Sequence, residues 1–168
     1  MQNIENFRKS LQFVLKHEGG FVNNPADKGG PTMWGVTQGT YDDYRKSLGE
    51  TPRYITSLTA DEATDIYSHR FWDVCGCDAL AYPLCTVVFD SAVNDGPSRA
   101  SAWLKTAKDV KDYMGIRKQY YLDLVKKNPA EQQFLRGWLN RLADLQKLVE
   151  VTQADTDYDV TKLPDWHY

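Results

Sequence analysis

The sequence predicts a mainly α-helical (α+β) protein with one small β region directly after its first helix. Apolar residues recur at helical spacing over most of the chain, and helix-capping patterns open several of these segments. Glycine and proline are concentrated between residues 19 and 36. The chain has 168 residues, of which 42% are hydrophobic and 26% charged, so it is long and apolar enough to fold around a core. A disordered chain is therefore excluded.

The first predicted helix ends at Gly19 and Gly20, and its last residue is Glu18. Its apolar stripe consists of Phe7, Leu11, Val14 and Leu15. Glu18 falls on this stripe, at the helical C-terminus, where partial burial and the helix dipole both favour a protonated carboxyl. The alternatives are an exposed glutamate at a frayed helix end and a glutamate paired with an arginine.

Residues 19–36 follow as loop and turn material. We expect short strands at residues 21–22 and 33–36, around a turn at 25–30. A small β region at this point would fold back over the end of the first helix, and Glu18 would then face a cleft.

The later elements are predicted to be helical. A helix begins near Thr40 and stops at Gly49, with Tyr41, Tyr44 and Leu48 on one side. Thr59 and Glu62 form a capping box that opens the next helix. Further helices are expected at about 85–95, 98–108 and 112–127, and a last one opens at Asn128 and Pro129. Residues 151–168 are predicted to be a polar, extended tail.

Composition also limits the partners. The net charge of −3 disfavours nucleic acid, and the uncharged stretches are too short to insert stably into a membrane. Cys75, Cys77 and Cys85 are odd in number and lack the usual spacing of zinc ligands, so we expect buried thiols with no metal and no cofactor. The first residues show no signal-peptide pattern, which predicts synthesis in a cytoplasm.

Glu18 is suited to cutting a glycosidic bond, a reaction that needs a protonated carboxyl on the leaving oxygen and a second group for water. Asp27 and Thr32 are the candidates for that second role, although Asp27 also fits a plain turn residue. Trp34 and Tyr41 are candidate walls for sugar rings, and core packing is the alternative for such aromatics.

These residues form a pattern that resembles glycoside hydrolase family 108, muramidases found largely as phage and prophage endolysins. The segments that carry the resemblance are HEGGF at 17–21, NPADKGG at 24–30, TMWGVT at 32–37, FWD at 71–73, FDSAVNDG at 89–96 and GWLNR at 137–141. The middle block is similar to the peptidoglycan-binding region usually paired with this catalytic region. The match runs from about residue 7 to about residue 145.

The resemblance implies a single lysozyme-like domain over residues 1–168, with a catalytic lobe at 1–84, a helical wall-binding lobe at 85–150 and the tail at 151–168. It implies that Glu18 is the acid that cleaves the β-1,4 bond after N-acetylmuramic acid in bacterial peptidoglycan. Asp90 and Asn94 are implied as polar sugar contacts, with a hydrogen bond between helices as the alternative. We expect a monomer that a holin partner releases to the cell wall in the periplasm.

Two departures and two rival functions remain. Thr32 lies one residue closer to Asp27 than the threonine of the similar Glu–Asp–Thr triad in phage lysozymes. Residues 105–112 compress a stretch that is longer in the family. One rival is a lytic transglycosylase, in which Glu18 acts alone and leaves a 1,6-anhydro product. The other is a non-catalytic wall-binding or virion module on the same fold.

Overall fold

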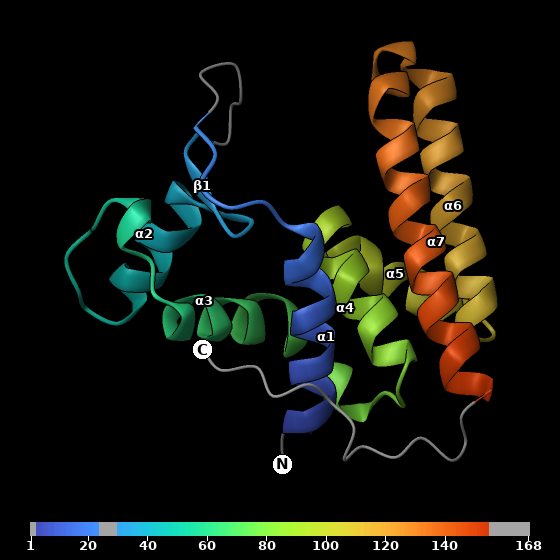
Figure 1. The fold of residues 1–168 in the computed structure, drawn as a ribbon, viewed down its shortest axis with the longest axis horizontal. Coiled ribbons are helices and arrows are strands. Elements are labelled where there is room, and N and C mark those ends of the chain that lie inside the picture. The colour runs from blue at the N-terminus through green and yellow to red at the C-terminus, as the bar shows by residue number, and fades with distance from the viewer. Residues whose placement is uncertain (1–2, 24–29, 155–168) are drawn as a thin grey trace. The chain divides into compact units, whose positions relative to one another are not determined.

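The computed structural model describes residues 3–23 and 30–154. The chain divides into two compact units, residues 1–108 and residues 109–168. The mainly helical fold with a small hairpin after the first helix is confirmed (Figure 1). The functional lobes expected at 1–84 and 85–150 stay a prediction. No helix within the described ranges is long and apolar enough to cross a membrane.

The core of the first unit is built around α4 (Leu84–Asp95), in which residues 85–92 are all buried. It packs along α1 (Ile4–His17), where Ser10 and Thr86 share a hydrogen bond of 2.7 Å between their hydroxyls (Figure 1). An aromatic cluster joins these helices to the next: the rings of Phe7, Trp72 and Phe89 meet edge to face at 5.3–5.9 Å. The helix that ends at Glu18 is therefore held in place by this core.

The β region is a hairpin of β1 (Thr32–Met33) and β2 (Val36–Thr37), with Met33 paired to Val36. Val22 adds an isolated bridge to Thr32. The strand predicted at 33–36 is wrong, because Trp34 and Gly35 form a two-residue turn with φ of 49° and 75°. Positive φ at both central residues matches the twist of a tight hairpin. These two residues therefore reverse the chain where a continuous strand was predicted. The turn predicted at 25–30 lies largely outside the described residues.

The segment after the hairpin joins α2 (Gln38–Ser47), η1 (Ile55–Ser57) and α3 (Ala60–Tyr67). The predicted capping box of Thr59 and Glu62 is confirmed. The predicted face of α2 is only partly right, because Leu48 is 56% exposed and Arg45 is buried in its place. Arg45 can be buried because its guanidinium pairs with Glu62 at 2.9 Å and with Glu50 at 2.7 Å.

A π-helical turn, η2 (Ser68–Trp72), continues α3, and the Asp73 N–H donates to the Ser68 carbonyl at 2.9 Å. The short η3 (Cys77–Ala79) and α5 (Pro97–Thr106) complete the first unit. The three cysteines are buried with free thiols, as predicted. Burial raises the pKa of each thiol, so all three remain protonated and unreactive near neutral pH.

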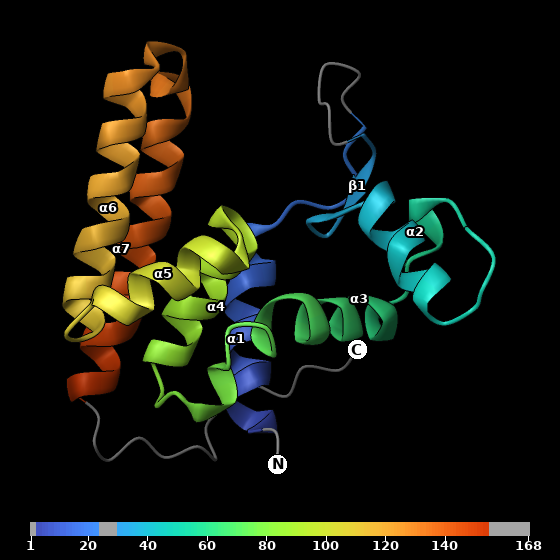
Figure 2. The same cartoon turned by 180° about the vertical axis from the view of Figure 1, so that it is seen from behind.

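The second unit is a helical hairpin of α6 (Val110–Lys127) and α7 (Gln132–Ala154), joined by η4 (Pro129–Glu131). The two helices run side by side in both views (Figures 1 and 2). The predicted opening at Asn128 is confirmed, and its side chain accepts from the Ala130 N–H at 3.3 Å. The tail was placed too early, because residues 151–154 continue α7. The remainder of the tail lies outside the described residues.

Candidate active site

Glu18 lies at the point where α1 ends. Its backbone turns to an extended conformation (φ −89°, ψ 143°), while its N–H still donates to the Leu15 carbonyl at 3.2 Å. The side chain is half-buried, as its place on the stripe predicts. Phe7, Leu11 and Val14 of that stripe are buried, whereas Leu15 is 36% exposed. Glu18 therefore ends the buried face of α1 and is itself only partly buried.

The hairpin turn lies directly against this carboxyl. A Cβ atom placed on Gly35 would lie 2.7 Å from Oε2 and 3.1 Å from Cδ of Glu18. Unbonded carbon and oxygen atoms do not approach so closely, so a side chain at position 35 would displace the Glu18 carboxyl, and the φ of 75° there also favours glycine. The Trp34–Gly35 turn therefore packs against the Glu18 side chain. The β region thus lies over the end of α1.

Tyr67 also contacts this turn. Its hydroxyl donates a 2.7 Å hydrogen bond to the Trp34 carbonyl. The same hydroxyl oxygen would lie 2.6 Å from a Cβ on Gly35, so Tyr67 and Glu18 flank the same face of that glycine. Tyr67 is only 1% exposed and is the last residue of α3. The site therefore joins the end of α1, the hairpin turn and the end of α3.

Of the two residues predicted to act with Glu18, the structure describes only Thr32. Thr32 is half-buried in β1, and its hydroxyl donates to the Gly30 carbonyl at 3.2 Å. It belongs to the same hairpin as the turn that contacts Glu18. Asp27 lies outside the described residues. Its role stays a prediction.

The two predicted aromatic walls differ in burial, and a role for Trp34 as a wall stays a prediction. Trp34 is half-buried in the turn beside Glu18. Tyr41 is fully buried, and its hydroxyl donates to Glu62 at 2.9 Å. The expectation that Tyr41 lines a subsite is corrected, because a fully buried ring has no face to offer a sugar.

The two residues of α4 that were expected to contact sugar differ in exposure. Asp90 is fully buried, so the expectation that it contacts sugar is corrected: its side chain lies in the helical core. Asn94 is exposed, and its side-chain amide donates to the Asp90 carbonyl at 2.8 Å, one turn earlier in the same helix. Its role as a sugar contact stays a prediction.

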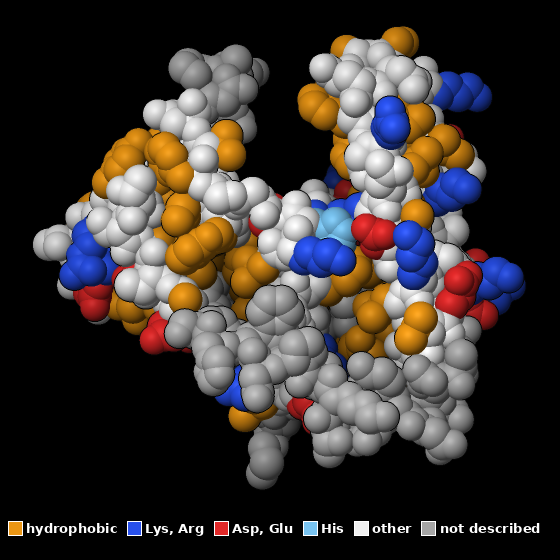
Figure 3. Space-filling view, viewed as in Figure 1, with side chains coloured by type: hydrophobic (Ala, Val, Ile, Leu, Met, Phe, Trp, Pro, Cys, Tyr) orange, Lys and Arg blue, Asp and Glu red, His pale blue; other side chains and the backbone are white. Residues whose placement is uncertain are grey.

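Two features were missed from the sequence. In the sequence, Tyr67 is one of several apolar-face residues of an amphipathic helix. Its neighbours in the chain give no sign that it contacts the Trp34–Gly35 turn. Phe21 and Tyr54 are 45% and 52% exposed, with ring centroids 6.4 Å apart. Figure 3 shows hydrophobic side chains gathered over the hairpin and α2 on this face. The position of Phe21, three residues after Glu18, was the one available signal.

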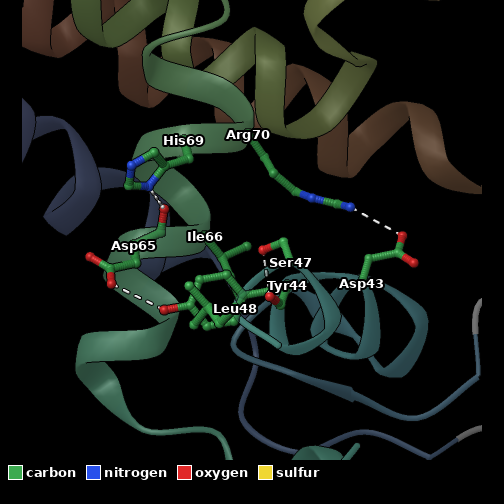
Figure 4. Close-up of a pocket in the computed structure, with 8 residues that line it drawn as sticks. All are labelled: Asp43, Tyr44, Ser47, Leu48, Asp65, Ile66, His69 and Arg70. Atoms are coloured by element: carbon green, nitrogen blue, oxygen red, sulfur yellow. Dashed lines mark hydrogen bonds and ion pairs between the residues drawn. The ribbon is translucent and has the colours of Figure 1, made fainter. Parts of the chain in front are cut away.

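A shallow pocket of about 270 Å³ lies between α2 and α3, and Glu18 is not among its lining residues (Figure 4). Its polar groups are already engaged with one another: Tyr44 donates to Asp65 at 3.1 Å, and Arg70 pairs with Asp43 at 3.1 Å. Burial and the Asp65 carboxylate raise the pKa of Tyr44 to about 12, so this hydroxyl stays a donor. We assign no chemistry to this pocket.

A half-buried glutamate at the end of the first helix, set against a hairpin turn in a helical unit, defines a lysozyme-like protein. The chain belongs to the family described as Glycosyl hydrolase 108, whose sequence profile matches residues 11–96. A second profile, described as Predicted Peptidoglycan domain, matches residues 92–143. The protein is therefore a glycoside hydrolase that acts on peptidoglycan, and the family resemblance is confirmed.

Among solved structures, that of SagA from Brucella abortus has the same fold, with a TM-score of 0.73. It is 23% identical, and the match covers 90% of this chain and 98% of that chain. No curated protein matches the chain.

Proposed function

We propose that the protein is a muramidase that hydrolyses the β-1,4 bond between N-acetylmuramic acid and N-acetylglucosamine, with Glu18 as the general acid. The observation that carries this proposal is the Glu18 carboxyl, fixed against the Gly35 turn yet only half-buried. A fixed carboxyl beside solvent is what protonation of a leaving oxygen requires.

In the proposed reaction, Glu18 transfers its proton to the glycosidic oxygen as the C1–O bond breaks. A water molecule adds to C1 of the muramic acid and gives up a proton to Asp27, the proposed base. In an inverting arrangement the two carboxyls would lie roughly 6.5–9.5 Å apart to leave room for this water. Thr32 supports the same step: its proton is used by the Gly30 carbonyl, so its lone pairs are open to a donor such as water.

Exposed aromatic faces would bind the sugars beside Glu18. Trp34 lies in the turn against the carboxyl, and Phe21, three residues after Glu18, pairs with Tyr54 at the start of η1. Flat apolar faces suit the C–H face of a hexose, while the ring edges leave the hydroxyls solvated. Asn94 is a proposed polar contact.

The nature of the product tests this function directly. Purified peptidoglycan is digested with the protein, and the released muropeptides are read by mass spectrometry. Hydrolysis leaves reducing muramic acid ends. Anhydro ends would instead establish the transglycosylase, with Asp27 as a turn residue. Sedimentation with the wall and no release would establish a non-catalytic binder.

Asp27→Asn tests the second carboxyl separately. We expect a folded variant with a large but incomplete loss of rate, because Asn can still hold a water without taking its proton. Thermal unfolding at the wild-type temperature is the required control. An inactive and unfolded variant would support the turn-only interpretation.

We also propose an endolysin-type setting, in which the protein is made in a host cytoplasm and reaches the periplasm through a holin. Expression in a bacterial host should then leave the culture intact until the inner membrane is permeabilised with chloroform, after which turbidity falls. Lysis without permeabilisation would contradict this setting and leave the wall chemistry untouched.

A further inference from the structure

We propose that Tyr67 is a positioning residue for Glu18, acting through the Trp34–Gly35 turn. This inference rests on the proposed function of Glu18 as the acid. It names a residue that holds the acid in place without touching the substrate.

The Tyr67 hydroxyl holds a turn that is strained. Trp34 has φ of 49°, a left-handed conformation that bulky side chains rarely adopt. Its carbonyl accepts the 2.7 Å hydrogen bond from Tyr67. A bond to the strained residue itself opposes relaxation of the turn.

The position of the turn controls the position of the carboxyl. The glycine face that meets Glu18 belongs to Gly35, the residue next to Trp34, and contact is so close that no Cβ fits between them. A shift of the turn toward Glu18 would displace the carboxyl, and a shift away would leave it room to rotate. A misplacement of about 1 Å can cost on the order of 100-fold in rate.

Tyr67 is itself well fixed. Its ring packs against Phe89 at 6.2 Å and against Phe71 at 5.7 Å. It is the last residue of α3, directly before the π-helical turn η2, a feature frequently found at functional sites. The aromatic core and the active-site turn are thereby connected through one hydroxyl.

The first test is Tyr67→Phe, which removes the hydroxyl and keeps the ring. We expect kcat on a soluble muropeptide oligomer to fall about 10-fold and KM to rise by a smaller factor, because the acid loses its support and Trp34, in the same turn, shifts with it. Rates are divided by the folded fraction from circular dichroism, which removes a merely structural effect. Tyr44→Phe is the matched control, since it loses a 3.1 Å bond to Asp65 in the same unit, and its kcat should not change.

The second test is rescue. Asn adopts positive φ readily, so Trp34→Asn relaxes the turn and makes the Tyr67 bond dispensable. Within the Trp34→Asn background, Tyr67→Phe should change kcat less than about twofold. The third variant, Gly35→Ala, places a methyl group against both the Glu18 carboxyl and the Tyr67 hydroxyl and should lower kcat at least 10-fold per folded molecule.

The outcomes separate the two proposals. If Tyr67→Phe keeps the wild-type kcat while Glu18→Gln is inactive, the positioning role is overturned and the function stands. If Tyr67→Phe lowers kcat equally in the wild-type and Trp34→Asn backgrounds, the positioning role is also overturned. Tyr67 would then not act on Glu18 through the turn. If Glu18→Gln remains active, both proposals fail together.

Discussion

Trp34 combines a large aromatic ring with a backbone conformation that large side chains rarely adopt. Its φ of 49° lies beside the 75° of Gly35, and the turn they form contacts Glu18. Strain of this kind persists where surrounding structure enforces it, and it is common at active sites. The proposed roles of Trp34 are therefore separate: the ring is proposed to contact the sugar, and the backbone forms the turn.

Trp34→Asn separates those roles, because Asn keeps the left-handed turn and removes the ring. We expect KM for peptidoglycan fragments to rise several-fold while kcat changes little and thermal stability is kept. Steady-state kinetics on a defined oligomer measures both constants. An unchanged KM would show that the ring is not a subsite wall.

At the same scale, the sequence reveals residues whose role follows from their own helix. The place of Glu18 at the end of the buried stripe was predictable from its spacing from Leu11 and Val14, and its role as the acid stays a proposal. Tyr67 is not found, since its role depends on a contact with a residue 33 positions away. Tyr41 and Asp90 are misassigned because aromatic and polar type alone does not reveal burial, and both are fully buried.

Helices α2 and α3 are joined by a polar cluster rather than by apolar contacts alone. Arg45 is 2% exposed, pairs with Glu62 and lies over the Tyr41 ring at 5.7 Å. Burial disfavours the Glu62 carboxylate, but the hydrogen bonds from Thr59, Tyr41 and Arg45 outweigh burial and lower its pKa. A capping glutamate is thus also the partner of a buried cation.

The pH dependence of stability follows from this lowered pKa. Glu62 contributes stability above the ordinary glutamate pKa, and this contribution is lost as pH falls through the lower folded-state value. We expect the difference in unfolding free energy between wild type and Glu62→Gln to be largest near neutral pH and to shrink on acidification below about pH 4.5. Urea unfolding at several pH values measures it.

Glu50→Gln is the control for this prediction, because Glu50 also pairs with Arg45 but is 46% exposed. Its effect should be smaller at every pH. A difference for Glu62→Gln that does not change with pH would contradict the account.

Element boundaries were predictable where a cap marks them. The capping box at Thr59 and the opening at Asn128 are visible locally. The position of the hairpin turn was not predictable, because a Trp–Gly pair is an uncommon turn sequence and the apolar residues around it suggest a strand. The buried Arg45 was also hidden, since its partners Glu50 and Glu62 come from other elements.

For the whole molecule, the two family profiles match successive parts of the chain, residues 11–96 and residues 92–143. The second match includes Phe134, an exposed aromatic residue of the α6–α7 hairpin that lies over two more buried rings. Phe134 is 51% exposed and adjoins Trp138, whose ring stacks on Tyr121 at 4.8 Å. Such a platform suits the apolar face of a sugar.

We expect Phe134→Ser to weaken sedimentation with purified walls several-fold while cleavage of a short soluble oligomer is kept. Val151→Ser is the matched control, because Val151 is an equally exposed apolar residue of α7 outside the matched region. Equal binding by the two variants would contradict a role for this aromatic group.

The central claim is that Glu18 is the acid that cleaves peptidoglycan. The most direct measurement compares wild type, Glu18→Gln and Glu5→Gln on purified walls, with released reducing ends as the readout. Glu5 lies in the first turn of the same helix, on its exposed side. The account predicts that Glu18→Gln is folded and essentially inactive while Glu5→Gln matches wild type. A folded Glu18→Gln variant that releases reducing ends at the wild-type rate would contradict it.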